Sequence, residues 1–333
     1  MKHVIIAGFD GALSTTITGV LDILSLTGVS WQRILSEKPE PQFKVWLASA
    51  DGSTIRCINH LEISAHMSFE EAMNNPTLLN NLIAIIVPTI GSPIEHTLTQ
   101  NPHMIDFLRW GFDKQLMIVG NCTGNFFLAE AGILNGKRAT THWGYKDLFK
   151  SRYPSIELHA DKLVTVDDNV YCAGGGLAWF DLGIHIIEQE LGYDFALQTA
   201  KAFVIDYRRD GQLSYGLSRM AARHNDELIA NIQCYLEDHY NQTQALEVIA
   251  FKFNVSKRTL IRRFKSALNM TPHAYLQQIR IEVAQKLLAE TQLSPEQIVQ
   301  RTGYEDMSSF RRLFKQHTGL TLSEYRRRFA KRL

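Results

Sequence analysis

One pattern occurs twice in the last hundred residues of this chain, as IAFKFNVSKRTLIRRFK (249–265) and IVQRTGYEDMSSFRRLFK (298–315). Each copy predicts a short apolar helix, a tight turn at Asn254 or Gly303, and a second helix that carries an Arg-Arg pair beside an apolar seam. Corresponding aromatic and arginine positions lie 50 residues apart. Two basic helix-turn-helix units at a fixed spacing indicate a protein that binds double-stranded DNA.

The distribution of charge agrees with this prediction. Residues 226–333 hold 17 Lys and Arg against 11 Asp and Glu, whereas residues 1–225 hold 18 against 23. A basic block behind an acidic one suggests that only the C-terminal part meets a polyanion. A solvated basic face would give the same counts, so the charge alone decides nothing.

The length of 333 residues favours two domains. Periodicity is lost in YRRDGQLSYGLSRMAARHN (207–225), which is polar and contains two glycines. We therefore expect an N-terminal domain over 1–205, a linker over 206–225 and a DNA-binding domain over 226–333.

The N-terminal part alternates apolar runs with segments of helical spacing. Four runs are typical of strands buried on both faces of a parallel sheet, namely 4–9, 43–49, 82–88 and 116–121. Segments 17–28, 68–75 and 102–114 predict helices between them, and 163–176 predicts a hairpin followed by a further helix. This order predicts a doubly wound, flavodoxin-like α/β domain with a parallel sheet.

Ligands of such sheets bind at the carboxyl ends of the strands. After the run 116–121 the chain reads Gly-Asn-Cys-Thr-Gly, which has the spacing of a nucleophile elbow and places Cys122 at the start of a helix. A helix N-terminus favours a thiolate or a bound anion, and His142 follows twenty residues later. Taken alone, Cys122 is more often a small buried apolar residue, and His142 a structural histidine.

The segment GNCTGNFFLAEAGILNGKRATTHW (120–143) resembles class I glutamine amidotransferase-like domains of the ThiJ/PfpI type. It is most similar to the version fused to AraC-type regulators, the GlxA-like family, over roughly residues 3–190. The resemblance places Cys122 at the cysteine position of the superfamily's enzymes. It implies ligand contacts from Cys122, Thr123, His142 and Gly175.

Two departures from the family's enzymes argue against catalysis. Thr123 stands where PfpI-type proteases have histidine, and the stretch 13–17 has no carboxylate where many ThiJ-like proteins place a glutamate. A thiol without a paired base is poorly activated. We therefore predict a ligand sensor with no catalytic residues, in which Cys122 and His142 are vestiges of an elbow.

No cofactor, metal site or membrane segment is predicted. The four cysteines are scattered and fit no metal spacing, which favours a reduced, cytoplasmic setting. No apolar run reaches the roughly 18 residues that a membrane helix needs. The N-terminus is typical of a first strand rather than a signal peptide.

The C-terminal segment resembles the AraC/XylS DNA-binding domain over about 100 residues, including its ending GLTLSEYRRRF (319–329). The resemblance implies base contacts from Arg258, Ile261 and Arg262 in the first unit, and from Met307, Ser308, Arg311 and Arg312 in the second. The helical faces add Thr259 and Lys265 to the outer surface of the first unit. We expect phosphate contacts from Lys265, Lys315 and Arg326–Arg328.

The sequence thus predicts a transcription regulator whose amidotransferase-like domain senses a small metabolite. The family resemblance further implies a homodimer, frequent activation of transcription with RNA polymerase as a further partner, and effectors that often contain nitrogen. The alternative is a Cys-dependent amidase or hydrolase fused to a DNA-binding domain, and a third reading is an inert α/β scaffold.

Overall fold

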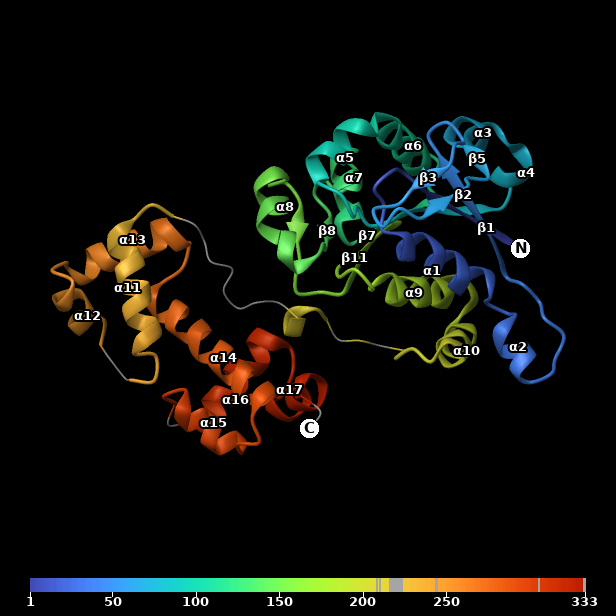
Figure 1. The fold of residues 1–333 in the computed structure, drawn as a ribbon. Coiled ribbons are helices and arrows are strands. Elements are labelled where there is room, and N and C mark those ends of the chain that lie inside the picture. Colours follow the sequence, from blue (N-terminus) through green and yellow to red (C-terminus); the bar gives the residue numbers. More distant parts are fainter. Residues whose placement is uncertain (208, 210, 216–223, 243–244, 305, 332–333) are drawn as a thin grey trace. The chain divides into compact units, whose positions relative to one another are not determined.

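The computed structural model describes residues 1–207, 209, 211–215, 224–242, 245–304 and 306–331 (Figure 1). The chain divides into two compact units, Met1–Gln212 and Leu213–Leu333. The linker that we expected over 206–225 falls partly outside the described residues. Of its described residues, Arg209 and Gln212 belong to the first unit and Leu213–Tyr215 to the second.

The first unit is built on one seven-stranded sheet of order β10-β11-β7-β6-β1-β2-β5. All neighbouring strands pair in parallel except the hairpin of β10 and β11. The strands are β1 Lys2–Ala7, β2 Phe43–Ser49, β5 Met67–Ser68, β6 Leu82–Val87, β7 Met117–Asn121, β10 Val164–Asp167 and β11 Val170–Ala173. This topology confirms the predicted doubly wound parallel sheet and its terminal hairpin.

Two small sheets lie outside the main one. In the first, β3 (Ile55–Arg56) pairs with β4 (Glu62–Ile63) in antiparallel fashion. In the second, β8 (Arg138–Ala139) pairs with β9 (Glu157–Leu158) in parallel. The segment that follows β8 runs past the carboxyl edge of the main sheet, and it carries His142.

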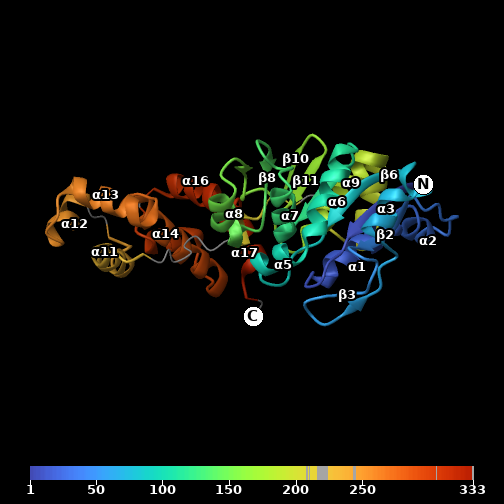
Figure 2. The same cartoon turned by 90° about the horizontal axis from the view of Figure 1, so that it is seen from above.

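Helices cover both faces of the main sheet (Figures 1 and 2). On one face α1 (Ser14–Ser25) packs against α9 (Trp179–Leu191), and α10 (Tyr193–Phe203) packs against α9 and α2 (Ser30–Ile34). On the other face α6 (Pro102–Asp113) packs against α7 (Asn125–Glu130). The remaining helices are α3 Phe69–Asn74, α4 Pro76–Leu79, α5 Ile94–Gln100 and α8 Lys146–Arg152.

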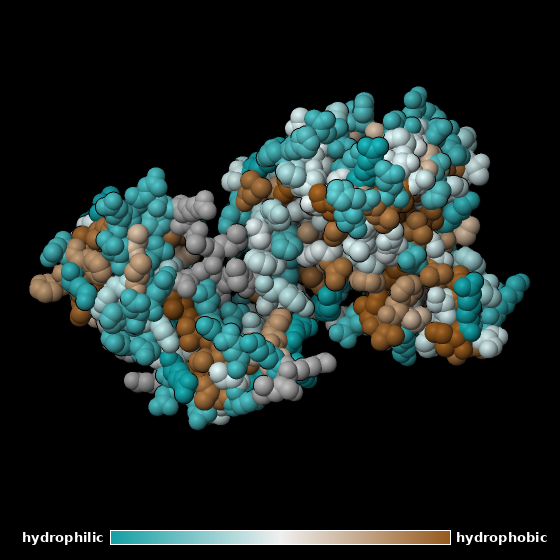
Figure 3. All heavy atoms as spheres, viewed as in Figure 1, coloured by the Kyte–Doolittle hydropathy of each residue, from teal (hydrophilic) through white to brown (hydrophobic). Residues whose placement is uncertain are grey.

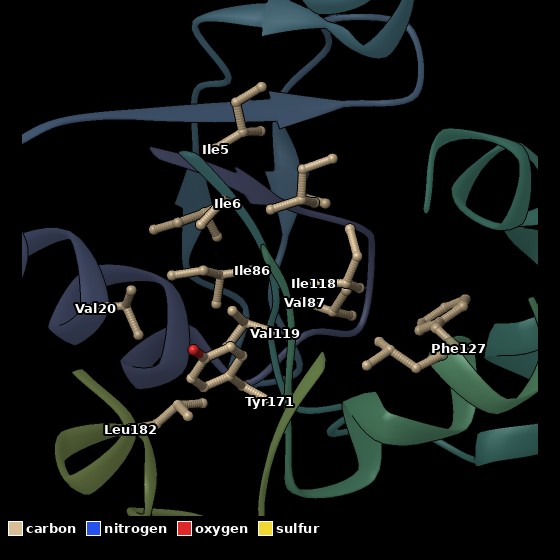
Figure 4. Close-up of a cluster of buried hydrophobic side chains, with 14 of the residues drawn as sticks. Ile5, Ile6, Val20, Ile86, Val87, Ile118, Val119, Phe127, Tyr171 and Leu182 are labelled. Atoms are coloured by element: carbon tan, nitrogen blue, oxygen red, sulfur yellow. The ribbon is translucent and has the colours of Figure 1, made fainter. Parts of the chain in front are cut away.

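The core of this unit lies on the two faces of the sheet. Figure 4 shows Ile5, Ile86 and Ile118 on the strands, with Val20 and Leu182 on one side and Phe127 on the other. These side chains are buried, which explains why their strands read as continuous apolar runs in the sequence. At the surface, Figure 3 shows apolar side chains over α2 and α10, where Ile34 and Val204 are exposed.

The second unit is entirely helical in its described residues. Its helices are α11 Glu227–Asp238, α12 Leu246–Lys252, α13 Lys257–Leu268, α14 Pro272–Glu290, α15 Pro295–Arg301, α16 Met307–Thr318 and α17 Leu322–Phe329. The helix pairs α12–α13 and α15–α16 are the two predicted helix-turn-helix motifs. The long helix α14 corresponds to the uninterrupted helix expected between them.

Two separate cores hold the helix-turn-helix motifs. Phe264 is fully buried in the first core together with Ile279 of α14. Phe314 is fully buried in the second, together with Ile281 of α14. One helix therefore supplies both cores from opposite faces, so each motif packs against the same rigid rod.

Candidate functional site

The turn of each helix-turn-helix motif is left-handed. Asn254 has φ 53° and Gly303 has φ 78°, so the two residues that best tolerate this backbone stand where the sequence placed the turns. At Gly303 a Cβ atom would lie only 2.4 Å from the carbonyl oxygen of Asn241, so glycine is required there for space as well.

The recognition helix of the first motif is α13. Its side chains Leu260 and Phe264 are fully buried, whereas Arg258, Arg262 and Lys265 are exposed. These three cations therefore lie on the solvent side of the helix, where base edges or phosphates could reach them.

The start of α13 is closed by hydrogen bonds between Ser256 and Thr259. The hydroxyl of Ser256, the N-cap, accepts from the Thr259 N–H at 3.1 Å and donates to the Thr259 hydroxyl at 2.9 Å. Thr259 is thus partly committed to the cap, and Ile261 is half-buried.

Arg263, beside the predicted Arg262, has a structural role. Its guanidinium forms a two-pronged bond to Asp226, with Nε–Oδ2 at 2.8 Å and Nη2–Oδ1 at 2.5 Å. Asp226 also caps α11 by accepting from the Ile229 N–H at 3.1 Å. The Arg263 hydrogen bond is the main reason that the pKa of Asp226 lies below its ordinary value. This pair fixes the recognition helix against α11, a role that the repeat pattern did not reveal.

The recognition helix of the second motif is α16. Ser308, Arg311 and Arg312 are exposed, and Phe310 and Phe314 are buried as predicted. Met307 is half-buried and packs against the second core, so it is less accessible than we expected.

The N-cap of α16 is Asp306, which the sequence analysis did not identify. Its carboxylate accepts from the N–H groups of Ser308 at 3.2 Å and Ser309 at 2.8 Å. Hydrogen bonds from Ser309 are the main reason that the pKa of Asp306 lies below its ordinary value. The backbone of Ser308 therefore serves the cap, while its side chain is exposed.

The candidate phosphate contacts divide into exposed and engaged groups. Lys315, Arg327 and Arg328 are exposed. Arg326 is half-buried instead, and its guanidinium donates to the carbonyl of Leu293 before α15. Arg326 thus links α17 to the segment before α15 and is less accessible than Arg327 and Arg328, so its contact with phosphate stays a prediction.

In the α/β unit, the backbone at Cys122 has the conformation of an elbow. Cys122 has φ 57°, a strained value for a residue with a side chain, between β7 and α7. A Cβ atom at Gly120 would lie 2.0 Å from Asn125 Oδ1, and one at Gly124 would lie 2.3 Å from the carbonyl oxygen of Pro88. The two glycines therefore permit the sharp turn that the spacing suggested.

Hydroxyl groups surround the elbow. Thr123 donates to the carbonyl of Ile90 at 2.8 Å, and Thr141 donates to the carbonyl of Cys122 at 3.0 Å. Thr16, in the stretch 13–17 that has no carboxylate, is buried and accepts from the Thr89 N–H at 3.1 Å.

The thiol of Cys122 is 4% exposed, and burial is the main reason that its pKa lies above the ordinary value. His142 accepts from the Gly144 N–H through Nδ1 at 3.0 Å, and burial lowers its pKa. Among the residues that the structure describes, no hydrogen bond joins Cys122 to His142. A neutral buried thiol without a bonded base is a poor nucleophile at neutral pH.

The glycine loop 174–176 comes close to the elbow from the other side. The amide of Asn121 donates to the carbonyl of Gly176 at 3.4 Å and to the hydroxyl of Thr89 at 2.7 Å. Its oxygen Oδ1 is buried and has no hydrogen-bond partner in the structure. Gly175 accepts from the Ala178 N–H at the start of α9. Asn121 thus offers an unused acceptor directly beside Cys122, and the sequence pattern did not single it out.

A separate hollow lies at the carboxyl ends of β1 and β2. Its volume is about 480 Å³, and Asp10 and Asp51 are the acidic side chains in its wall. Within the described part of the chain, no group of three or more His, Cys, Asp or Glu residues could hold a metal ion. The described helices include none that is long and apolar enough to cross a membrane.

Both parts of the chain match models of known protein families. Residues 249–328 match a family model described as a helix-turn-helix domain, and residues 26–189 match the DJ-1/PfpI family. The HTH-type transcriptional regulator CdhR of Pseudomonas aeruginosa is 28% identical, over 80% of this chain and 76% of its own. Isonitrile hydratase of Pseudomonas putida is 33% identical, over 30% of this chain and 42% of its own.

Among solved structures, Drosophila melanogaster DJ-1beta superposes with a TM-score of 0.51 at 18% identity, covering 62% of this chain and 99% of its own. At that identity the likeness shows the fold alone. It agrees with the parallel sheet and flanking helices described above.

Proposed function

We propose that this chain, whose two parts belong to the DJ-1/PfpI and helix-turn-helix families, is a sequence-specific transcription regulator controlled by a small metabolite. The observation that carries the proposal is the pair of recognition helices. Each presents exposed arginines behind a left-handed turn, and both pack on the single helix α14.

The length of α14 supports simultaneous binding of both motifs. Its 19 residues span roughly 28 Å at the rise of an α-helix. Successive major-groove faces of B-DNA lie about 34 Å apart. A rod of this length suits two recognition helices in adjacent grooves on one face of DNA.

The side chains suggest how contacts divide between bases and phosphates. Arg258, Arg262, Arg311 and Arg312 are the candidates for guanine edges, because a guanidinium binds O6 and N7 together. Ile261 offers only an apolar contact, such as to a thymine methyl group. Lysine and the tail arginines suit phosphate, and these candidates are Lys265, Lys315, Arg327 and Arg328.

The ligand-sensing part of the proposal concerns the elbow. We place the metabolite near Cys122, Thr123, His142 and Gly175, at the carboxyl edge of the sheet. The unused acceptor of Asn121 supports this placement, because a buried polar atom without a partner is uncommon and favours a ligand with a donor group. A homodimer, a cytoplasmic location and contact with RNA polymerase belong to the same proposal.

The alternative function, a Cys-dependent hydrolase or amidase, draws support from the strained elbow and from the enzyme among the relatives. The raised pKa of Cys122 and the lack of a carboxylate in the stretch 13–17 argue against it. If the wild-type protein turned over a substrate and Cys122→Ser abolished that activity, this alternative would be established.

The test of the regulator proposal is a selection of bound sequences from random double-stranded DNA. The full-length protein should enrich one site and bind it about 10³-fold or more tightly than random DNA at physiological salt. Arg262→Ala and Arg312→Ala should each weaken that site by about 1–3 kcal/mol. Arg109→Ala, an exposed change in the α/β unit, is the matched control. Equal affinity for all sequences would refute the proposal.

A further inference from the structure

The α/β unit ends in a segment that is bound into its own interior. Gln212 is the last residue of this unit, and it is 1% exposed although it follows the final helix of the domain. Its backbone N–H donates to the carbonyl of Asp161 at 3.2 Å. Three residues earlier, Arg209 forms an ion pair with Asp181 and donates to the carbonyl of Leu177. Arg209 and Gln212 are therefore both held against the α/β unit.

The side chain of Gln212 occupies a buried site lined by hydrogen-bond acceptors, which we call the Gln212 seat. Its amide nitrogen lies 2.8 Å from the carbonyl oxygen of Thr141, 3.0 Å from that of Ala160 and 3.2 Å from that of Lys162. Only a donor fits among three carbonyl oxygens, so this site selects an amide and rejects a carboxylate.

The same seat has one unfavourable feature. The side-chain oxygen of Gln212 is buried and has no hydrogen-bond partner among the described residues. A buried acceptor without a partner costs part of what the nitrogen gains. Among the side-chain contacts of the described residues, the seat therefore holds Gln212 through its amide nitrogen and not through its amide oxygen.

Thr141 joins the seat directly to the elbow. Thr141 accepts the hydrogen bond of Gln212 with its carbonyl and donates its hydroxyl to the carbonyl of Cys122 at 3.0 Å. The neighbouring Thr140 accepts from Asn125 at 2.8 Å, at the start of the helix behind the elbow. Any movement of Cys122 that displaces Thr141 must also displace an acceptor of Gln212.

The glycine loop 174–176 forms the other side of the Gln212 seat. A Cβ atom at Gly174 would lie 2.4 Å from Nε2 of Gln212, whereas one at Gly176 would meet no atom within 4 Å. Gly176 in turn accepts from Asn121 beside the thiol. The loop thus contacts the elbow with one residue and Gln212 with another.

We propose that Arg209 and Gln212 form a latch whose docking at the Gln212 seat is coupled to the state of the Cys122 elbow. When the elbow is closed, the seat is intact and the segment is held. When a ligand or a modification opens the elbow, Thr141 shifts and the segment is released. Because coupling is reciprocal, removal of the segment also opens the elbow. The inference builds on the proposed sensing role, but its test needs neither the effector nor the operator.

The first experiment measures alkylation of Cys122 by iodoacetamide in the full-length protein, resolved by mass spectrometry. Gln212→Glu keeps the shape of the side chain and places a carboxylate among carbonyl oxygens. We expect alkylation of Cys122 to accelerate by about 10- to 100-fold, the factor that corresponds to the loss of such a buried bond. Gly174→Ala should also accelerate the alkylation of Cys122, whereas Gly176→Ala should be alkylated at the wild-type rate.

Cys57 serves as the internal control, because it is buried in the core of the same unit. Equal acceleration of alkylation at Cys57 would show general unfolding and would overturn the latch. An unchanged alkylation rate at Cys122 in both Gln212→Glu and Gly174→Ala would also overturn it.

A second experiment uses only the wild-type chain, so it remains decisive if the variants fail to fold. Brief reaction with N-ethylmaleimide modifies the exposed Cys234 and gives the reference sample, whereas prolonged reaction also places a bulky group on the buried Cys122. Hydrogen exchange then follows the backbone amide of Gln212. We expect faster exchange at Gln212 than in the reference sample, with unchanged exchange in β1 and β2. An unchanged rate at Gln212 would refute the coupling. Failure of these tests leaves the proposed DNA binding intact, whereas failure to select a DNA site leaves the latch intact.

Discussion

The pair of Asp226 and Arg263 offers the sharpest test of how the first recognition helix is positioned. Asp226 caps α11 through the Ile229 N–H and also binds the guanidinium of Arg263 on α13. Asp226→Ala removes both interactions, whereas Asp226→Asn keeps a capping side chain and removes the charge. The two variants therefore separate the cap from the ion pair.

The magnitudes follow from these contacts. Loss of an N-cap costs about 1 kcal/mol. An ion pair that solvent partly screens adds about 0.2–1 kcal/mol. We expect Asp226→Ala to lower the free energy of unfolding of the helical unit by roughly 1–2 kcal/mol, and Asp226→Asn to lower it by less than about 1 kcal/mol.

The pH dependence has a defined sign. The pKa of the folded Asp226 lies below that of the unfolded chain, mainly because of the Arg263 hydrogen bond. Its stabilisation is therefore complete above the ordinary carboxyl pKa and disappears as the pH falls through the folded value. Urea unfolding, followed by circular dichroism at 222 nm between about pH 3 and 7, measures this difference. Equal losses for Asp226→Ala and Asp226→Asn, or a wild-type difference that grows as the pH falls, would refute the reasoning.

Three further predictions concern other parts of the chain. Phe264→Ala and Phe314→Ala should each lower the free energy of unfolding by about 3–5 kcal/mol. Because the two cores are separate, hydrogen exchange should rise in α12–α13 for Phe264→Ala and in α15–α16 for Phe314→Ala. A uniform rise in both variants would contradict this. Gly124→Ala should lower the melting temperature of the α/β unit far more than Gly176→Ala, since its Cβ would meet the Pro88 carbonyl oxygen at 2.3 Å and that at Gly176 would meet nothing within 4 Å. Equal effects in calorimetry would speak against a tight elbow. Alkylation of Cys122 should stay slow at pH 8 and rise only above its ordinary pKa of about 9, because burial raises that pKa; a plateau reached below pH 8 would indicate an activated thiolate and favour the enzyme alternative.

Much of the architecture could be predicted because it depends on local patterns. Strands such as β6 and β7 are buried on both faces, so their apolar runs identified them directly. The turns at Asn254 and Gly303 were recognisable because few residues tolerate a left-handed backbone. The elbow at Cys122 was recognisable for another reason, namely the spacing of its flanking glycines Gly120 and Gly124.

The interactions that could not be predicted join residues far apart in the sequence. Arg262 and Arg263 are adjacent and chemically identical, and only the position of Asp226 on another helix decides which one is free for DNA. The engagement of Arg326 could not be predicted for the same reason, because its partner is the carbonyl of Leu293. Gln212 lies in a segment without periodicity, so no pattern marked it as buried.

The central claim is that both recognition helices enter DNA together, in successive major grooves. Methylation interference on the selected site tests it most directly, because methylation of guanine N7 blocks the contacts expected of Arg258, Arg262, Arg311 and Arg312. We predict two clusters of interfering guanines about 10 base pairs apart on one face of the helix. Arg262→Ala should remove one cluster and Arg312→Ala the other. A single cluster that both variants weaken equally would contradict the account.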